Sequence, residues 1–371
     1  MECSEGHLFT EPDNIIMLFK PDWRETRQRL TDFWNGKYTG RPCIALYAPD
    51  PKPDLKPPEQ PSSERDIYLN FDWYIKNLEY RFSTTAFLGE ALPSDSVMAG
   101  YTISYGSRVK FTQSTIWIEP VENLDIEDKN IFNLDWQSAE IQAFLNFYTR
   151  FVQAGSGKFL IGQPAILPGN DFLSMIMGSE KFLTGLVDKP DAMKSVIMKL
   201  AKNWVFIKKN LTEIYTKYQE GYGICWLGLW CPYPFISTQS DISCMLSEEM
   251  FEQFIVPEIE LVGREFKTVI YHLDGPGALH HLERLCKIPE IKMIQWVPGA
   301  GRSYSVREWL WLYKKIQDAG KIIMAYVEPE EINFFLRNLD SRLSFIVCGC
   351  KTKKEAEQVL LNIEKLSGPK A

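Results

Sequence analysis

The chain has 371 residues, of which 45% are hydrophobic and 24% are charged, and its formal net charge is −7. This composition is typical of a globular protein with a large core and argues against disorder. The acidic balance and the lack of a long Lys/Arg tract argue against nucleic-acid binding. No run of about 18 apolar residues or secretory leader is evident. We therefore expect a cytoplasmic protein that binds neither nucleic acid nor membrane.

The N-terminal part has a less regular pattern than the rest of the chain. Residues 1–40 are expected to form a helical extension, and residues 41–371 a barrel domain. RPCIALYAP (41–49) predicts a first strand, TAFLGEAL (85–92) a second, and YGSRVKFTQSTIWIEPV (105–121) a hairpin-like insertion. Six prolines in residues 48–64 predict an extended loop, which is either a lid over an active face or a solvated surface loop.

From residue 158 onward, short apolar runs alternate with amphipathic stretches, as in consecutive βα units. The predicted strands are KFLIGQP, GICWLGLW, KTVIYHL, IKMIQWV, KIIMAYV and LSFIVCG. The clearest predicted helices cover residues 191–218, 247–266, 306–320 and 353–366. Together with the earlier strands this makes about eight or nine strands, which favours a single closed (β/α)8 TIM-type barrel over an open doubly wound sheet.

Three of the four histidines fall within VIYHLDGPGALHH (269–281). His272 and Asp274 are expected at the carboxyl end of a parallel strand, where barrel enzymes place their catalytic groups. Residues two apart in a strand project to one side, so both could serve as acid/base groups or as part of a zinc site. A hydrogen-bonded polar role for His272 is the alternative. His280 and His281 are expected in the following helix, outside the chemistry.

Cys348 and Cys350, in IVCGC, have the same two-residue spacing at the end of the last predicted strand. One of these thiolates, joined to His272 and Asp274, would complete a three-ligand zinc site with an open fourth position. Such a zinc ion would lower the pKa of a bound thiol or water. The alternative is that both cysteines only fill an apolar strand end. The eight cysteines are expected to be free thiols or ligands, because no secretion signal accompanies them.

Further candidate substrate-binding residues follow other predicted strands. An aromatic cluster could line an apolar cavity, a loop aspartate could bind substrate, and a glycine-rich turn with an arginine could hold an anion. Core packing is the alternative for the aromatic cluster, and turn formation is the alternative for the aspartate. These residues are Trp230, Tyr233, Asp241, Gln295, Trp296 and Arg302.

Three segments, in this order, resemble the uroporphyrinogen decarboxylase superfamily: LIGQPAILPGNDFLSMIMGSEKFLTGLVDKPDAMKSVI, QSDISCMLSEEMFEQFIVPEIELV and YHLDGPGALHHLERL. The resemblance covers about residues 155–365. It implies a (β/α)8 barrel with a deep cavity at the carboxyl ends of the strands. The superfamily includes the decarboxylase and zinc-dependent methyltransferases that move a methyl group from a corrinoid protein to coenzyme M.

The methyltransferase branch holds zinc with a His-x-Cys pair and a cysteine near the end of the chain. His272 matches the histidine, and Cys348 or Cys350 matches the late cysteine, but Asp274 stands where the pattern has cysteine. A carboxylate is a harder ligand than a thiolate, which changes the metal preference. The decarboxylase branch fits less well, because APDPKPDLKPP lacks the arginines that would neutralise the carboxylates of a porphyrinogen.

The sequence therefore predicts a metal-assisted methyltransferase that uses zinc and a methylated corrinoid, carried by a partner protein, or a small methylated compound. Two alternatives stay open: a metal-free decarboxylase or lyase acting on a small organic acid through His272 and Asp274, and a non-catalytic protein that binds a corrinoid or aromatic ligand. A homodimer is possible.

Overall fold

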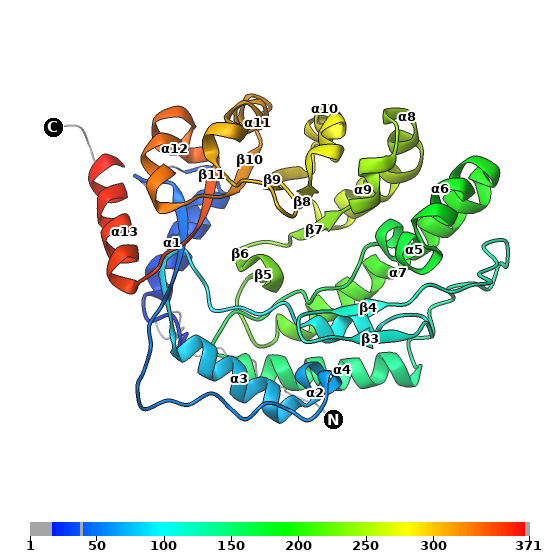
Figure 1. The fold of residues 1–371 in the computed structure, drawn as a ribbon, viewed down its shortest axis with the longest axis horizontal. Coiled ribbons are helices and arrows are strands. Elements are labelled where there is room, and N and C mark those ends of the chain that lie inside the picture. Colours follow the sequence, from blue (N-terminus) through cyan, green and yellow to red (C-terminus); the bar gives the residue numbers. More distant parts are fainter. Residues whose placement is uncertain (1–16, 38–39, 368–371) are drawn as a thin grey trace, which may run out of the picture.

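The computed structural model describes residues 17–37 and 40–367, which form an α/β protein with a central seven-stranded sheet (Figure 1). The strand order is β2-β1-β11-β10-β9-β8-β7. All neighbouring strands are parallel except β1 and β2, which are antiparallel. The strands of this sheet are β1 Cys43–Pro49, β2 Thr85–Gly89, β7 Ile236–Gln239, β8 Val269–Asp274, β9 Ile291–Val297, β10 Ile322–Tyr326 and β11 Ser344–Gly349.

Helices surround the strands on the outside of the molecule (Figure 1). A single π-helical turn, residues 251–255, joins α8 to α9. The helices are α1 Trp23–Trp34, α2 Glu64–Leu69, α3 Phe71–Ser83, α4 Ala139–Gly155, α5 Gly169–Met177, α6 Ser179–Asp188, α7 Pro190–Tyr215, α8 Glu248–Met250, α9 Val256–Phe266, α10 Leu282–Lys287, α11 Val306–Asp318, α12 Ile332–Asn338 and α13 Lys353–Ser367.

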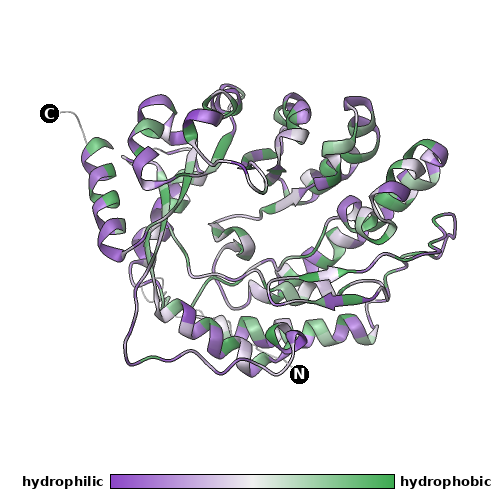
Figure 2. Cartoon of the chain, in the orientation of Figure 1, coloured by the Kyte–Doolittle hydropathy of each residue, from purple (hydrophilic) through white to green (hydrophobic). Residues whose placement is uncertain are grey.

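Alternate residues of each strand enter two different apolar cores, as the two-residue period of a strand requires. On β8, Tyr271 and Leu273 join the core between the sheet and the outer helices. Ile270 belongs to the inner core, where it is grouped with Met293 of β9 and Met324 of β10. The strands of the central sheet are mostly hydrophobic, whereas the helices carry both hydrophobic and hydrophilic residues (Figure 2). His272 and Asp274 lie two and four residues after Ile270 on the same strand. Their side chains therefore project to the same face as Ile270, which is the inner face of the sheet.

The sheet is compatible with a TIM-like barrel, but strand pairing does not close it into a continuous barrel within the described residues. KFLIGQP was predicted as a strand, and the structure shows only an isolated parallel bridge between Gln163 and Ile224. Gly162 packs directly on Gly223 here, and an added Cβ at Gly162 would lie 2.3 Å from the Gly223 carbonyl oxygen. The backbone of residues 160–165 also bonds residues 93–96, so extended segments rather than regular strands occupy this side.

GICWLGLW was also predicted as one strand, which is wrong. It forms an antiparallel hairpin of β5 Tyr222–Ile224 and β6 Leu229–Cys231. A 3-10 turn separates the two strands and ends at Gly228, whose φ of +62° favours glycine. The sheet position beside β8 belongs instead to β7, which the sequence did not predict.

Several other predictions are confirmed. The insertion after β2 contains the antiparallel hairpin of β3 Val109–Phe111 and β4 Ile116–Ile118. The four predicted helices correspond to α7, the α8 to α9 segment, α11 and α13. After the end of β1, residues 50–63 of the proline-rich segment contain no strand and run beside α3, where Trp73 Nε1 donates to the Glu59 carbonyl at 2.7 Å.

The proposed N-terminal extension, residues 1–40, lies partly outside the described residues, and its described part contains α1. The domain boundary at residue 41 stays a prediction. Within residues 17–37 and 40–367, no helix combines the length and apolar character needed to cross a bilayer.

Candidate metal centre

The candidate site lies where the carboxyl ends of β7, β8 and β9 meet. His272 of β8 is in register with Gln239 of β7 on one side and with Gln295 of β9 on the other. Asp241 begins the 3-10 turn that follows β7. Parallel strands align their carboxyl ends at one edge of a sheet, so polar residues from three separate segments of the chain come together here.

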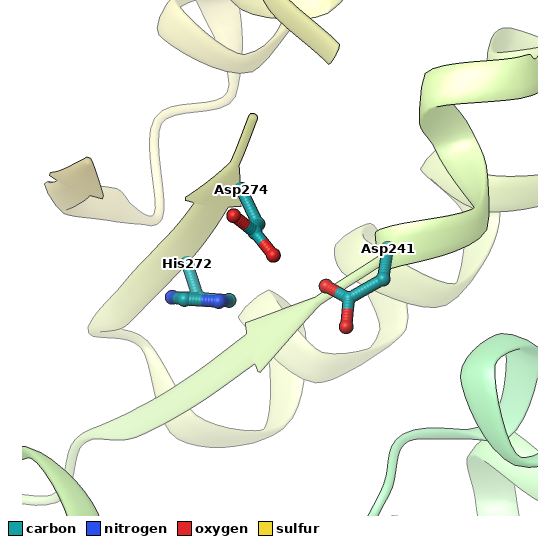
Figure 3. Close-up of side chains that lie close together, drawn as sticks. All are labelled: Asp241, His272 and Asp274. Carbon is teal, nitrogen blue, oxygen red and sulfur yellow. The ribbon is translucent and has the colours of Figure 1, made fainter. Parts of the chain in front are cut away.

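Asp241, His272 and Asp274 each direct one potential ligand atom toward a common point, and these atoms lie within 4.8 Å of one another (Figure 3). Asp241 is exposed, whereas His272 and Asp274 are half-buried. Asp274 Oδ1 is buried and accepts no hydrogen bond. An unpartnered buried carboxylate oxygen is costly, and a cation would satisfy it.

Hydrogen bonds from neighbouring strands hold the His272 ring. Its Nδ1 donates to Gln295 Oε1 at 2.6 Å, and Gln295 Nε2 donates to the Tyr326 hydroxyl at 3.0 Å. With the Gln295 amide in this orientation, its oxygen accepts from Nδ1 of His272, which leaves Nε2 free of this hydrogen bond. The edge of the Trp226 ring packs on His272, with centroids 5.3 Å apart. Nε2 is therefore oriented and available as a ligand.

Asp241 is held by a buried aspartate, Asp171, that the sequence did not identify. Asp171, in the first turn of α5, accepts a 2.8 Å bond from the Asp241 backbone N–H and a 3.0 Å bond from Gln239 Nε2. Gln239 Nε2 also donates to Asp241 Oδ2 at 3.1 Å. The only sequence signal for Asp171 is a charged residue at the start of an otherwise apolar helix, GNDFLSMIM.

Accumulated negative charge is the main electrostatic feature of the site. Burial raises the pKa of Asp171 well above its usual range, and repulsion from Asp241 adds to this effect. Desolvation of its carboxylate also raises the pKa of Asp241, with Asp274 adding to the shift and His272 opposing it. A bound divalent cation would neutralise this repulsion.

The donor set therefore fits a divalent metal. One imidazole nitrogen and two carboxylate oxygens form a three-residue set that leaves coordination positions open, as in catalytic zinc sites. Oxygen donors also suit metals harder than zinc, because the set lacks a thiolate. Of these three candidate ligands, the sequence predicted His272 and Asp274 to bind metal and Asp241 to bind substrate.

The structure does not bring Cys348 and Cys350 to this site. Within the described residues the metal-ligand group contains neither cysteine. Cys348 is in register with Leu46 of β1, and both enter the core under the outer helices. Cys350 belongs to the same core, and the two sulfur atoms are 4.0 Å apart. The cysteines therefore face the opposite side of the sheet from His272, with two strands between β11 and β8.

The other predicted substrate-binding residues divide into two groups. Gln295 lies at the site and orients His272. Arg302 is exposed in the loop after β9, where its backbone N–H bonds Gly299. An added Cβ at Gly299 would lie 3.8 Å from Asp274 Oδ1, so this loop borders the site.

Trp230, Tyr233 and Trp296 have packing contacts in this structure. Trp230 is 2% exposed and packs edge-on against Trp23 of α1, while its carbonyl accepts from Trp34 Nε1. The Tyr233 hydroxyl donates to the Trp34 carbonyl at 2.7 Å. These two aromatic side chains therefore anchor the N-terminal helix. Trp296 faces outward from β9 and packs on Trp309 of α11.

His280 and His281 are outside the site, as predicted, but they lie in a 3-10 turn before α10. His280 Nε2 bonds the Leu246 carbonyl at 2.8 Å, and His281 Nε2 bonds the Ser243 carbonyl at 2.9 Å. The His281 ring stacks on Phe251 with centroids 4.0 Å apart. Burial lowers the pKa of His281, which keeps this structural ring neutral.

Comparisons with known proteins support the fold. The structure is similar to that of a methyltransferase from Methanosarcina mazei, with a TM-score of 0.56 and 11% sequence identity. The similarity covers 92% of this chain and 98% of that chain. Comparison of the sequence with protein-family models and with curated proteins finds no match. At this level of identity the similarity shows a shared fold.

Proposed function

We propose that this protein is a metal-dependent methyltransferase whose metal ligands are Asp241, His272 and Asp274. The observation that carries the proposal is the convergence of these three ligand atoms within 4.8 Å, with Asp274 Oδ1 buried and unpartnered. The name of the structurally similar protein supports methyl transfer as the reaction. Zinc is the first metal to test, and a methylated corrinoid on a partner protein or a small methylated compound is the proposed methyl donor.

A bound zinc ion would supply Lewis acidity, which lowers the pKa of a thiol and favours the nucleophilic thiolate near neutral pH. The protein's own groups have supporting roles. Gln295 keeps the Nδ1 proton of His272 in place, so that Nε2 is directed inward. Gln239 and Asp171 hold Asp241 in position from two sides. Trp226 packs against the His272 ring in a T-shaped arrangement and helps to hold it in place.

The test is the metal content of the purified native chain, measured by inductively coupled plasma mass spectrometry before and after incubation with zinc. His272→Ala, Asp274→Ala and Asp241→Ala should each lose the metal. Cys348→Ser and Cys350→Ser are matched controls that should retain it, because both sulfur atoms face the outer core.

Methyl transfer is then measured with methylcobalamin and a small thiol, by the loss of the methylcobalamin absorbance. We expect turnover only with metal-loaded native protein. A native chain that takes up no metal would contradict the proposal and favour a metal-free lyase that uses His272 and Asp274 for proton transfer. Binding of the corrinoid without turnover would favour a carrier protein.

A further inference from the structure

A cavity of about 180 Å³ adjoins the candidate metal centre. Its walls come from residues 164–168, from α7 and from β7. Trp226 and Gln239 line the cavity and also contact the centre, through His272 and Asp241 respectively. A molecule in this cavity would therefore reach the site from one side.

The cavity contains a buried lysine. Lys208 lies on the apolar face of α7 between Trp204 and Leu211, and it is 4% exposed. Its Nζ donates to the Pro164 carbonyl at 2.6 Å and lies 5.3 Å from the centroid of the Trp204 ring. No carboxylate in the described part of the chain pairs with it. An ammonium has three N–H donors, so Lys208 can still bind further acceptors.

Lys20 is another buried lysine, and its contacts are those of a structural residue. It is 0% exposed, and its Nζ donates to Asp22 and to the carbonyls of Phe87 and Gly89. Lys208 has one carbonyl in place of these three acceptors. A buried charge without a counterion is costly, and such groups concentrate at functional sites.

A second observation points to a polar ligand. Thr238 of β7 lines the same cavity, is 3% exposed, and its hydroxyl has no hydrogen-bond partner. Native structures rarely leave such groups unsatisfied unless a ligand or water completes them. The cavity therefore holds an unneutralised cation, and a buried, unpartnered hydroxyl belongs to a residue of its wall.

We propose that this cavity binds a compact carboxylate of about benzoate size, with the carboxylate against Lys208 and the opposite end toward Asp241, His272 and Asp274. A protein cavity of ~150 Å³ accommodates benzene, so the volume suits one small ring. Tyr101, Trp204 and Trp226 supply aromatic walls. Lys208 offers a cation to the anionic end, and in the metal-free protein the acidic centre would repel that end.

Burial also lowers the pKa of Lys208 to about 7, and a neighbouring carboxylate would stabilise its charged form. This inference assigns a substrate class to the proposed function. It rests on that function only for the role of the ligand's end opposite the carboxylate. Carboxylate binding itself requires neither metal nor methyl transfer, so the two proposals can fail separately.

The experiment is isothermal titration calorimetry of the full chain with benzoate and with benzamide, which has the same shape but no charge. Both are titrated into EDTA-treated protein and into zinc-loaded protein. Benzoate should bind the native chain at least ten-fold more tightly than benzamide in either state. Binding of benzoate only to the zinc-loaded protein would place the carboxylate on the metal and overturn the proposal.

Lys208→Met should weaken benzoate binding at least ten-fold, whereas Lys209→Met is the matched control on the same helix. Lys209 is half-exposed and pairs with Glu265, so its substitution should leave binding unchanged. Thr238→Val, which is nearly isosteric, should weaken benzoate binding about three-fold and keeps the test decisive if Lys208→Met does not fold. Equal affinity of benzoate and benzamide, or no effect of Lys208→Met in a folded protein, would overturn the proposal.

A chain that binds benzoate through Lys208 but takes up no metal would contradict only the methyltransferase proposal. A chain that takes up metal and transfers methyl groups but binds no carboxylate would contradict only the assignment of this cavity.

Discussion

His272 and Asp274 at the end of β8 can be compared with Cys348 and Cys350 at the end of β11. Both pairs have one residue between them, and both occur where a parallel strand ends. His272 and Asp274 turn toward the inside of the sheet, where Asp241 joins them. The cysteines enter the apolar core beneath the outer helices.

The different environments give the two pairs different chemistry. Burial raises the pKa of Cys348, and the neighbouring Cys350 adds to the effect, so its thiol stays protonated. His272 is oriented by Gln295, and Asp274 keeps an unpartnered oxygen. A spacing of two residues therefore places both side chains on one face of a strand. The residues at the ends of the neighbouring strands determine whether that face forms a polar site or part of the apolar core.

The strongest test of this difference is the removal of one inward ligand. His272→Ala should reduce zinc affinity by more than about 100-fold, because loss of a direct ligand exceeds the 10–100-fold effect typical of outer-shell changes. Competition with a chromogenic chelator measures the affinity. Unchanged affinity in a folded variant would show that the metal, if bound, lies elsewhere.

A smaller effect is expected from the residue that orients the ligand. Gln295→Leu should reduce zinc affinity by roughly 10-fold to 100-fold, because the His272 ring loses its acceptor. Trp296→Phe is the matched control, since Trp296 neighbours Gln295 but faces the outer core. If both variants lowered the affinity equally, the distinction between the two faces of β9 would be contradicted.

The buried lysine beside the site should affect stability as well as binding. Lys208→Met should raise the free energy of unfolding at pH 7 by about 1–3 kcal/mol, because an apolar side chain of similar volume replaces a buried ammonium. Urea unfolding followed by circular dichroism measures the difference.

The difference in free energy of unfolding between Lys208→Met and the native protein should decrease as the pH rises. Burial lowers the pKa of Lys208 from 10.5 to about 7, so its contribution to native stability is full above pH 10.5 and is lost as the pH falls toward 7. The advantage of Lys208→Met should therefore shrink between pH 7 and pH 9. An advantage that grows over this range would contradict an ammonium with a lowered pKa.

The smallest effect on stability is expected from Cys348 and Cys350, which face the outer core. Cys348→Ala should lower the free energy of unfolding by about 1 kcal/mol, because a small group is removed from a packed core. Zinc affinity should not change, as chelator competition would show. A Cys348→Ala variant of native stability that loses its metal would place this thiol at the site after all.

Local pattern predicted most of the secondary structure. Consecutive apolar runs identified β8 to β11, and helical periodicity identified α7, α9, α11 and α13. The segments with weak or misleading local signals were predicted less well. Glycine-rich GICWLGLW turned back on itself at Gly228, and the four-residue strand β7 was too short to be recognised.

Two members of the candidate metal group, His272 and Asp274, were named together from the sequence for the same reason. His272 and Asp274 share one strand, and the two-residue period alone places them on one face. Lys208 was missed, although a charged residue between Trp204 and Leu211 interrupts the apolar face of α7 and could have been noticed. Asp171 could not be connected with the site from the sequence, because its link to Asp241 joins α5 to the turn after β7.

The sequence by itself thus determined the βα alternation and the pairing of His272 with Asp274, because both follow from periodicities within a single segment. Only the tertiary structure decided that Asp241 would complete the group and that the cysteines would not. Ligand sets require atoms from separate strands to converge within a few ångströms. That convergence depends on strand order and on which face of the sheet the helices cover, and neither is encoded by the spacing of residues along one strand.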